Sequence, residues 1–274
     1  MYEGIEPGRR EYLIKIILII QAIVQGILEW LPVSSSSFVA LLSLLFGNET
    51  LSEAVNIALF MHLGSGLAAL ILLRTDIIIH LRNLLRQEQE NTYVDPVIYI
   101  IGLIISIITA LIVYNTLISV VSNVSLAFIL IGVSLLITAF VTRKKKLHYG
   151  LERVGKIDLL ILFILQGIAI IPGISRSGIV LAYLGFRRVK PDTAFRINLF
   201  IGIPILLLAG VYGFINIINT IQVLTALFVE LIVFCTSFVT AYYLLNYFKK
   251  IQTWLFPLII GILLLISSTI DLIQ

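Results

Sequence analysis

The chain has few charged residues and only one cysteine. Asp, Glu, Lys and Arg make up 12% of its 274 residues, and 59% of the residues are hydrophobic. An average soluble domain is about 25% charged, so the composition excludes a soluble globular fold and indicates an integral membrane protein. The lone Cys235 excludes an intrachain disulfide framework. Because no basic block carries interleaved aromatic residues, no nucleic-acid partner is expected.

Long apolar stretches alternate with short polar connections, which predicts an all-α polytopic membrane protein with one membrane domain over residues 1–274. A spanning helix needs about 20 apolar residues. The N-terminal run resembles a secretory signal peptide, but Glu29, Trp30 and Pro32 interrupt it, so it is kept as mature structure. The apolar stretches lie at about 12–31, 33–46, 54–73, 96–119, 124–142, 157–171, 173–186, 197–217, 220–246 and 253–272.

Lys and Arg gather in some connections and are absent from others. The positive-inside rule places basic connections in the cytoplasm and the uncharged ones, near 115–124 and 214–222, outside. The connections at 143–156 and 187–196 are both basic, so the chain between them must enter and leave by one face. Residues 157–186 are therefore predicted to be a re-entrant pair that turns near Pro172 and Gly173.

The N-terminal pair, residues 12–46, has a similar sequence. Gln25-Gly26, then Pro32 and a run of serines, compares with Gln166-Gly167, then Pro172 and Ser175. This similarity predicts an inverted-topology repeat, in which each half is a re-entrant helix pair followed by three transmembrane helices. Repeat 1 covers 12–142, repeat 2 covers 157–272, and 143–156 is the cytoplasmic connection. Six spans leave both termini outside.

Arg176 is a guanidinium between long apolar runs. A charge at membrane depth costs about 2.5–3.5 kcal/mol on insertion scales, so it usually faces a partner or a ligand. A helix that restarts after Pro32 or Pro172 presents unpaired N–H groups, which suit an anion. The hydroxyls of Ser175 and Ser177 flank the charge, and Gly173 and Gly178 allow close backbone approach. A phosphate group is the expected ligand.

Glu29 lies one helical turn after Gln25, so the two side chains share a helix face. The carboxylate could hold a divalent cation together with substrate oxygens, act as a general base, or neutralise Arg176. A single carboxylate is weak support for a metal site.

Other polar residues within apolar segments have two open interpretations each. His62, the only histidine within an apolar span, is either a hydrogen-bonded packing residue or part of the site. Asn198, beside Arg196, either supports the site or packs at an interface. Glu230, a second carboxylate within a span, either pairs with a basic group or lies near a lipid headgroup. The run of hydroxyls after Pro32 either caps a helix or contacts phosphate, and phosphate contact is favoured; it comprises Ser34, Ser35, Ser36 and Ser37.

Three motifs give a specific resemblance. The sequence Gln-Gly-Ile-Leu-Glu-Trp-Leu-Pro-Val-Ser-Ser-Ser at 25–36, His-Leu-Gly-Ser at 62–65, and Pro-Gly-Ile-Ser-Arg-Ser-Gly at 172–178 resemble the undecaprenyl-diphosphate phosphatase family, first known for bacitracin resistance. The similarity covers nearly the whole chain. It implies a membrane enzyme that removes one phosphate from a C55 or similar polyprenyl diphosphate and regenerates the monophosphate carrier. It also implies a site open to the outer face and a divalent cation, usually Mg²⁺ or Ca²⁺.

The resemblance also assigns residues. Glu29, Ser34 and Ser35 match the family's first tip, and Arg176 matches the arginine of the second, with Ser35 at a nucleophilic or phosphate-orienting position. Two departures stand out, because Gln25 replaces a family glutamate and Phe38 replaces a histidine. The first weakens the metal assignment. The second removes the base usually next to the serine, so that His62 or Glu29 could substitute, water could be the nucleophile, or activity could be reduced.

The prediction is a polyprenyl-diphosphate phosphatase of the cell membrane, with its site at two re-entrant tips. The predicted catalytic residues are Ser35, Glu29, Arg176 and His62, with Glu29 also the metal ligand. The predicted substrate-binding residues are Ser34, Ser36, Ser37, Gln25, Gly173, Ser175, Ser177, Gly178 and Asn198. The partners are the lipid substrate and the membrane, and a homodimer is left open. The alternative is a flippase or transporter of polyprenyl phosphate or another anion with little or no hydrolysis.

Overall fold

The computed structural model describes residues 7–47, 49–86, 94–120, 124–142, 151, 153–171, 173–219, 221–247, 258–259, 261–262 and 265. Over these residues the fold is all α-helical, as predicted, apart from an isolated bridge between Leu151 and Val189. The helices are α1 Pro7–Leu28, α2 Ser35–Phe46, α3 Leu51–Phe60, α4 His62–Leu72, α5 Arg74–Arg86, α6 Pro96–Val120, α7 Val124–Thr142, α8 Lys156–Ile168, α9 Arg176–Phe186, α10 Pro191–Ile217 and α11 Val223–Tyr247.

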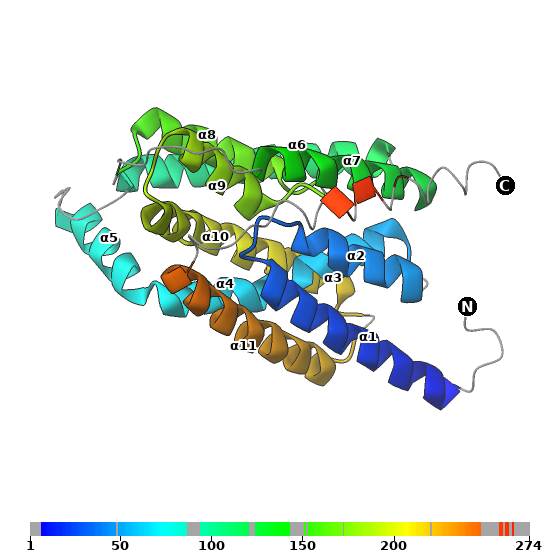
Figure 1. Ribbon diagram of the computed structural model, residues 1–274. Helices are drawn as coiled ribbons and strands as arrows, with labels where there is room; N and C mark the ends of the chain where they lie inside the picture. The colour runs from blue at the N-terminus through cyan, green and yellow to red at the C-terminus, as the bar shows by residue number, and fades with distance from the viewer. Residues whose placement is uncertain are drawn as a thin grey trace.

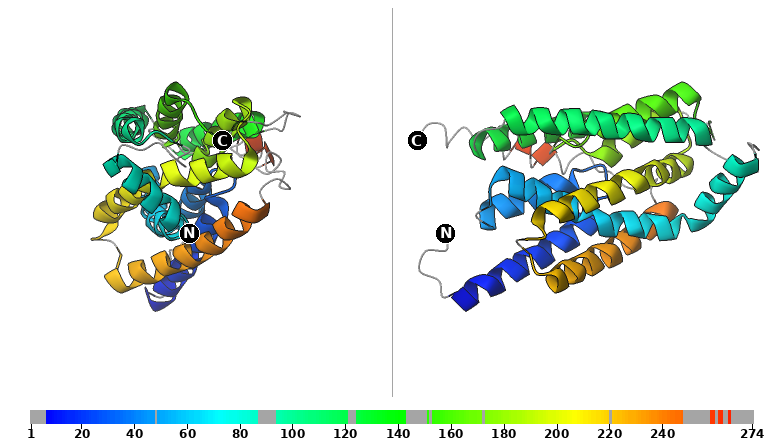
Figure 2. Two further views of the ribbon diagram at one scale, coloured as in Figure 1. Left: turned by 90° about the vertical axis from the view of Figure 1, so that its left-hand side faces the viewer. Right: turned by 180° about the vertical axis from the view of Figure 1, so that it is seen from behind.

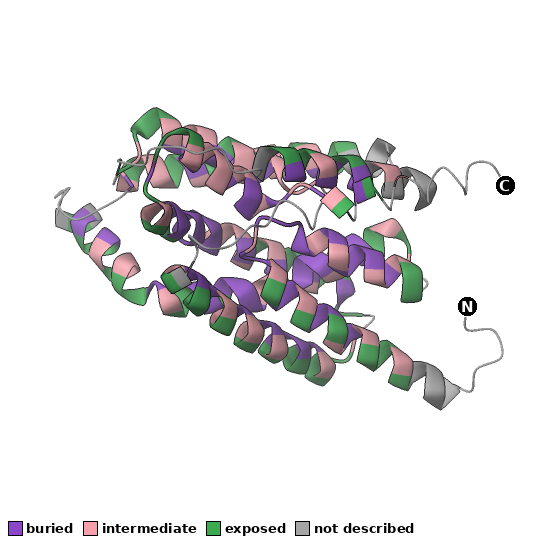
Figure 3. Ribbon diagram, viewed as in Figure 1, coloured by how far each residue is buried: buried purple, intermediate pink, exposed green. Residues whose placement is uncertain are grey.

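Most of these helices run in roughly one direction, and they form layers. In Figures 1 and 2, α6, α7 and α8 lie along one side, α1 and α11 lie along the opposite side, and α10, α4, α3 and α2 lie between them. The α5 helix lies at one end of the molecule and is inclined to the other helices. Figure 3 shows that buried residues concentrate in the middle layer, whereas exposed residues follow the outer helices.

Four described segments are long and apolar enough to cross a membrane. They are Leu51–Leu72, Pro96–Thr116, Pro191–Ile217 and Val223–Asn246. The predicted spans at 54–73, 96–119, 197–217 and 220–246 correspond to them, which makes the chain a multi-pass membrane protein. α7 covers the predicted span at 124–142, but only some of its side chains are described. The predicted span at 253–272 lies almost entirely outside the described residues, as do both termini.

The segment at 157–186 turns back on itself, as predicted. Leu151 pairs with the chain beyond α9: its N–H donates to Arg188 O at 3.1 Å, and its carbonyl accepts from Lys190 N–H at 2.9 Å. The two ends of the α8–α9 pair therefore lie at the same end of the molecule. Pro172, at the predicted turn, lies outside the described residues, whereas Gly173 adopts a positive φ of 98°.

The N-terminal pair is also antiparallel. The Gln21 Nε2 group on α1 donates to Val39 O at 3.1 Å and to Ser43 Oγ at 2.8 Å, both on α2. Both predicted hairpins are thus present as helix–turn–helix units.

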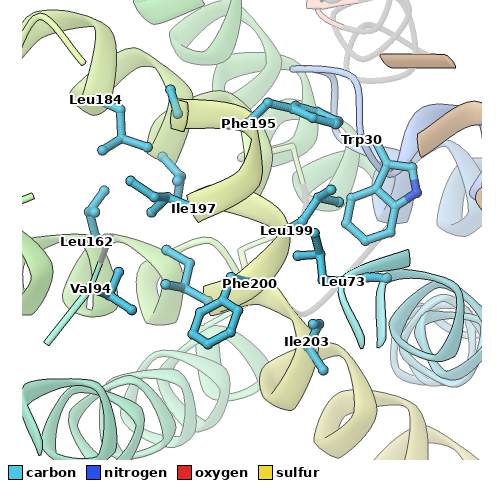
Figure 4. Packing of buried hydrophobic residues seen from close by; sticks show 14 of the residues in the cluster. Trp30, Leu73, Val94, Leu162, Leu184, Phe195, Ile197, Leu199, Phe200 and Ile203 are labelled. Carbon is cyan, nitrogen blue, oxygen red and sulfur yellow. The ribbon is translucent and has the colours of Figure 1, made fainter. Parts of the chain in front are cut away.

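Each hairpin packs on a long helix from the other half of the chain. α1 lies against α11, and α8 lies against α6, while α10 packs on both α3 and α4. This packing of each hairpin on the other half agrees with an inverted repeat. The inverted repeat itself stays a prediction. The main core surrounds α10, where Phe195, Ile197 and Leu199 pack with Trp30 of the first hairpin and Leu73 (Figure 4). The tip of the first hairpin, which carries Trp30, is therefore fixed against the core around α10.

Gly173 provides a test of the second turn. Its positive φ disfavours any side chain by about 1–2 kcal/mol, and an added Cβ would overlap the Ser134 side chain and Ile131 O. Gly173→Ala should therefore lower the thermal unfolding midpoint in detergent. Gly185→Ala, where an added Cβ meets nothing within 4 Å in the helix α9, is the matched control and should keep or raise the midpoint. Equal midpoints for the two variants would contradict the turn.

Candidate active site

Glu29 is the centre of a polar cluster that joins the two hairpin tips. It follows the end of α1 and is 5% exposed. Arg176 Nη2, from the start of α9, donates to Glu29 Oε1 at 2.9 Å. Ser35 Oγ, from the start of α2, donates to Glu29 Oε2 at 2.7 Å. One carboxylate therefore holds the predicted nucleophile and the predicted phosphate-binding cation.

Two further side chains approach the same carboxylate. Gln25 Nε2 donates to Glu29 Oε2 at 2.8 Å, one turn away on α1 as the sequence predicts. His62 Nε2, at the start of α4, lies 3.5 Å from Glu29 Oε2. His62 therefore lies beside the polar cluster, and its role in the site stays a prediction.

The His62 ring has a defined proton arrangement. Its Nδ1 lies 2.6 Å from Ala58 O. A carbonyl oxygen only accepts hydrogen bonds, so in this geometry Nδ1 carries a hydrogen. The other ring nitrogen, Nε2, faces Glu29.

Backbone groups of each tip also bond to a serine side chain of the other tip. Gly173 N–H donates to Ser34 Oγ at 3.2 Å, and Ser177 Oγ donates to Leu31 O at 2.7 Å. Ser34 Oγ is also 2.8 Å from Ser37 Oγ. The tips therefore form one unit, as the repeated motif predicts.

Arg176 is held on several sides. Its Nη1 donates to Asn198 O at 3.3 Å, and its guanidinium carbon lies 5.7 Å from the Trp30 ring centroid, a cation–π arrangement. Trp30 is fixed in turn, because its Nε1 donates to Ser237 Oγ at 2.7 Å. Gly202 leaves the space that the guanidinium occupies, since an added Cβ would overlap Arg176 Nη1. The buried Nε group has no hydrogen-bond partner among the described residues.

The helix that begins at the first tip presents free donors. Ser34 is the N-cap of α2, and its side chain makes no capping hydrogen bond. The N–H groups of the first turn of α2 therefore add the positive end of a helix dipole to the site. At the second tip, Ser175 Oγ accepts from Gly178 N–H at 3.0 Å and caps α9 itself.

A cavity of about 400 Å³ connects this cluster to an apolar channel. Its polar end is lined by Glu29, Ser34, Ser35, Ser36, His62, Gln166, Ser175, Arg176 and Ser177. The rest of its lining is apolar and comes largely from α3, α6 and α10. Lining residues of α6 and α10 such as Leu111, Leu208 and Ile215 are about half exposed or more, so the cavity opens between these helices. The shape suits a molecule with a charged head and a long apolar tail.

The remaining predicted residues act behind the cavity. Gln25 and Ser37 are fully buried and reach it through Glu29 and Ser34. Gly173 contributes its N–H to Ser34, and Gly178 contributes its N–H to Ser175. Asn198 contributes its carbonyl to Arg176, while both polar atoms of its buried side chain lack a partner within the described part of the chain.

Phe38 stands where the resembling family has a histidine, and it packs against Leu41, Ile131 and Leu135. No base replaces that histidine on α2. The imidazole near Glu29 is that of His62, which comes from a different helix.

Sequence reasoning missed three residues that position Arg176. Trp30 and Ser237 are 207 positions apart, so no local pattern connects them. The contact of Gly202 with the guanidinium forms only in the folded chain. Gln166 was recognised in the repeated motif, which was the available signal that it lines the site.

The donor set can be tested for a divalent cation. Among the described residues, no group of three His, Cys, Asp or Glu side chains has the spacing of a metal site. Gln25 Oε1, however, is buried without a partner in the described structure, and its amide is bonded to Glu29. Mg²⁺ often uses one or two carboxylates and takes its other ligands from phosphates and water. Glu29 with Gln25 Oε1 fits that pattern as a minimal protein contribution.

Comparison with known proteins identifies the family. The family described as "Bacitracin resistance protein BacA" matches residues 18–265. The chain belongs to this family.

Members of the bacitracin resistance family that resemble this chain share one name, undecaprenyl-diphosphatase. The Methanococcoides burtonii protein is 36% identical over 216 residues, which cover 74% of this chain and 81% of that protein. The Haloarcula marismortui protein is 29% identical over 87% of this chain and 92% of its own length. The Oceanobacillus iheyensis protein is 30% identical over 84% of this chain and 86% of its own. The similarity therefore spans both hairpin tips.

Gly202 tests the placement of the guanidinium in this family member. Gly202→Ala should displace Arg176 from Glu29 and lower phosphate release from a polyprenyl diphosphate by about 10-fold or more, because transition-state charge loses a donor. The measurement is steady-state release of inorganic phosphate in detergent. Gly185→Ala, which adds the same methyl group in open space, should retain the rate. Full activity of Gly202→Ala would show that the guanidinium does not need this position.

Proposed function

We propose that this protein hydrolyses a polyprenyl diphosphate of the undecaprenyl type to the monophosphate and inorganic phosphate, and so recycles the lipid carrier. The observation that carries the proposal is the contact of Ser35 and Arg176 with the two oxygens of one buried Glu29. The names of the relatives point to the same reaction. The apolar cavity beside the cluster supplies a place for the tail.

In the first step, Ser35 Oγ attacks the terminal phosphorus. Its proton passes to Glu29 Oε2, 2.7 Å away, and the bond to the bridging oxygen breaks so that polyprenyl monophosphate leaves. Water then attacks the phosphoserine, the bond between phosphorus and Ser35 Oγ breaks, inorganic phosphate leaves, and Ser35 Oγ takes back a proton from the attacking water. Since His62 Nε2 lies 3.5 Å from the same oxygen, it accepts the proton from Glu29 and restores the base.

Charge on the transferring phosphoryl group is stabilised by donors from both tips. Arg176 supplies a fixed cation, with its Nε–H unpartnered among the described residues, and the first turn of α2 supplies backbone N–H groups. Phosphoryl transfer depends mainly on such positioned charge. Burial of the site strengthens each interaction because the local dielectric is low.

A divalent cation, Mg²⁺ or Ca²⁺, belongs to this proposal. Glu29 and Gln25 Oε1 would hold it, and it would supply positive charge to the diphosphate oxygens. Gln25 in place of a carboxylate makes this a weakly charged site.

The location is proposed to be the cell membrane, with both termini outside and the cavity facing the outer side. The support is the distribution of basic connections in the sequence. A homodimer is a further prediction from the sequence that the single chain leaves untested.

Ser35 and Arg176 are tested by substitution. Ser35→Ala and Arg176→Lys should each lower phosphate release by at least about 10²-fold, because one removes the nucleophile and the other removes the fork that bridges Glu29 and Asn198. Ser52→Ala and Arg82→Lys, at exposed positions, are matched controls and should leave the rate unchanged. The assay uses purified protein in detergent with polyprenyl diphosphate and Mg²⁺.

Two outcomes would contradict the proposal in different ways. No phosphate release, together with lipid movement across vesicles, would favour the transporter. Phosphate release without a phosphoenzyme on Ser35 after acid quenching of labelled substrate would make water the nucleophile and Ser35 its orienting group.

A further inference from the structure

Glu230 is a buried carboxylate that the proposed reaction does not use. It lies in α11 and is 9% exposed. The sequence suggested a basic side chain or a lipid headgroup as its partner, but the structure gives it a backbone group. Gly64 N–H, on α4, donates to Glu230 Oε2 at 2.5 Å. Glu230 Oε1 has no partner within the described residues. Such a polar group at membrane depth usually has a function.

The Gly64 contact lies at a break in a membrane span. α3 ends at Phe60 and α4 begins at His62, so one 22-residue span is two helices with Met61 between them. The first N–H groups of a helix lack intrahelical acceptors, and an acceptor or a negative charge there stabilises the helix start. Gly64 N–H is one of these groups, and Met61, the N-cap, makes no side-chain capping bond. Glu230 supplies the missing acceptor from another helix.

The two backbones are in close contact at this point. A Cβ added to Gly64 would lie 2.7 Å from both Glu230 O and Glu230 Oε2, and 2.9 Å from Phe234 N. There is no room for a larger side chain at position 64 between the two helices. The start of α4 is therefore fixed relative to α11.

His62 is the first residue of the helix that Glu230 caps. Its Nδ1 lies 2.6 Å from Ala58 O, and its Nε2 faces Glu29 at 3.5 Å. A shift of the start of α4 would therefore carry the ring away from the carboxylate.

We propose that Glu230 is a positioning residue, which caps the start of α4 and thereby holds His62 against Glu29. The inference rests on the proposed function only for its kinetic effect, since the geometric effect exists without catalysis. Either protonation state of Glu230 offers an acceptor oxygen to Gly64, so the role needs the acceptor and not the charge.

The substitutions separate these two properties. Glu230→Gln keeps an acceptor oxygen and removes the charge, so it should retain kcat within about 3-fold. Glu230→Met has a similar length and no such acceptor, so it should lower kcat for phosphate release by about 10-fold with little change in KM. Should the methionine variant fail to fold, Glu230→Asp, which withdraws the acceptor by one methylene, should show the same direction of change. Equal losses in the glutamine and methionine variants would overturn the capping role.

A double-mutant cycle distinguishes positioning from general destabilisation. In a His62→Gln background, Glu230→Met should change kcat by less than about 2-fold, because the ring that Glu230 positions is already absent. Multiplicative losses would show that Glu230 acts independently of His62 and would overturn the proposal.

A spectroscopic measurement keeps the test independent of activity. The chain has three histidines, so ¹⁵N-histidine labelling gives a simple ring spectrum in which His62→Gln assigns the His62 signal. That signal should move in Glu230→Met and stay in place in Glu230→Gln. An unmoved signal in both variants overturns the inference. Absence of phosphate release by the unsubstituted protein would reject the proposed function alone, and this spectrum would still decide the role of Glu230.

Discussion

The ion pair between Glu29 and Arg176 joins two hairpins that come from opposite halves of the chain. A buried charge without a partner is strongly unfavourable, so each tip can carry its charge only while the other tip is in place. The hydrogen bonds of Gly173 with Ser34 and of Ser177 with Leu31 follow from the same approach. Trp30, next to Glu29 in the sequence, packs in the core around α10 and so connects the first tip to that core. Formation of the site and assembly of the fold are therefore coupled.

The same pair explains how a hydroxyl, a carboxylate and a cation from separate segments of the chain come together. Oε1 of Glu29 is committed to Arg176, which leaves Oε2 for Ser35, Gln25 and His62. A ligand phosphate competes with the carboxylate for the guanidinium, so binding of the substrate would strengthen the basicity of Glu29 at the moment when Ser35 must lose its proton. In the proposed mechanism, anion recognition and activation of the nucleophile are therefore properties of one cluster.

Much of the architecture could be predicted because it depends on local features of the sequence. Apolar stretch length gave the spans, charge in the connections gave the turn-back at 157–186, and the repeated Gln-Gly…Pro…Ser pattern placed both tips. The break at Met61 has no proline or charge to mark it, so 54–73 was expected to be one helix. The support around Arg176 also escaped prediction, because Trp30, Ser237 and Gly202 meet only in three dimensions. Glu230 was visible as an unusual residue, but its partner is a backbone N–H on another helix.

The central claim is that both tips together form one anion site, and a structure with bound vanadate tests it most directly. Vanadate adopts the geometry of a transferring phosphoryl group, so its density should lie within hydrogen-bond distance of Ser35 Oγ, of the first N–H groups of α2 and of the Arg176 guanidinium at once. Density that contacts only one tip, or that lies away from Glu29, would contradict the account.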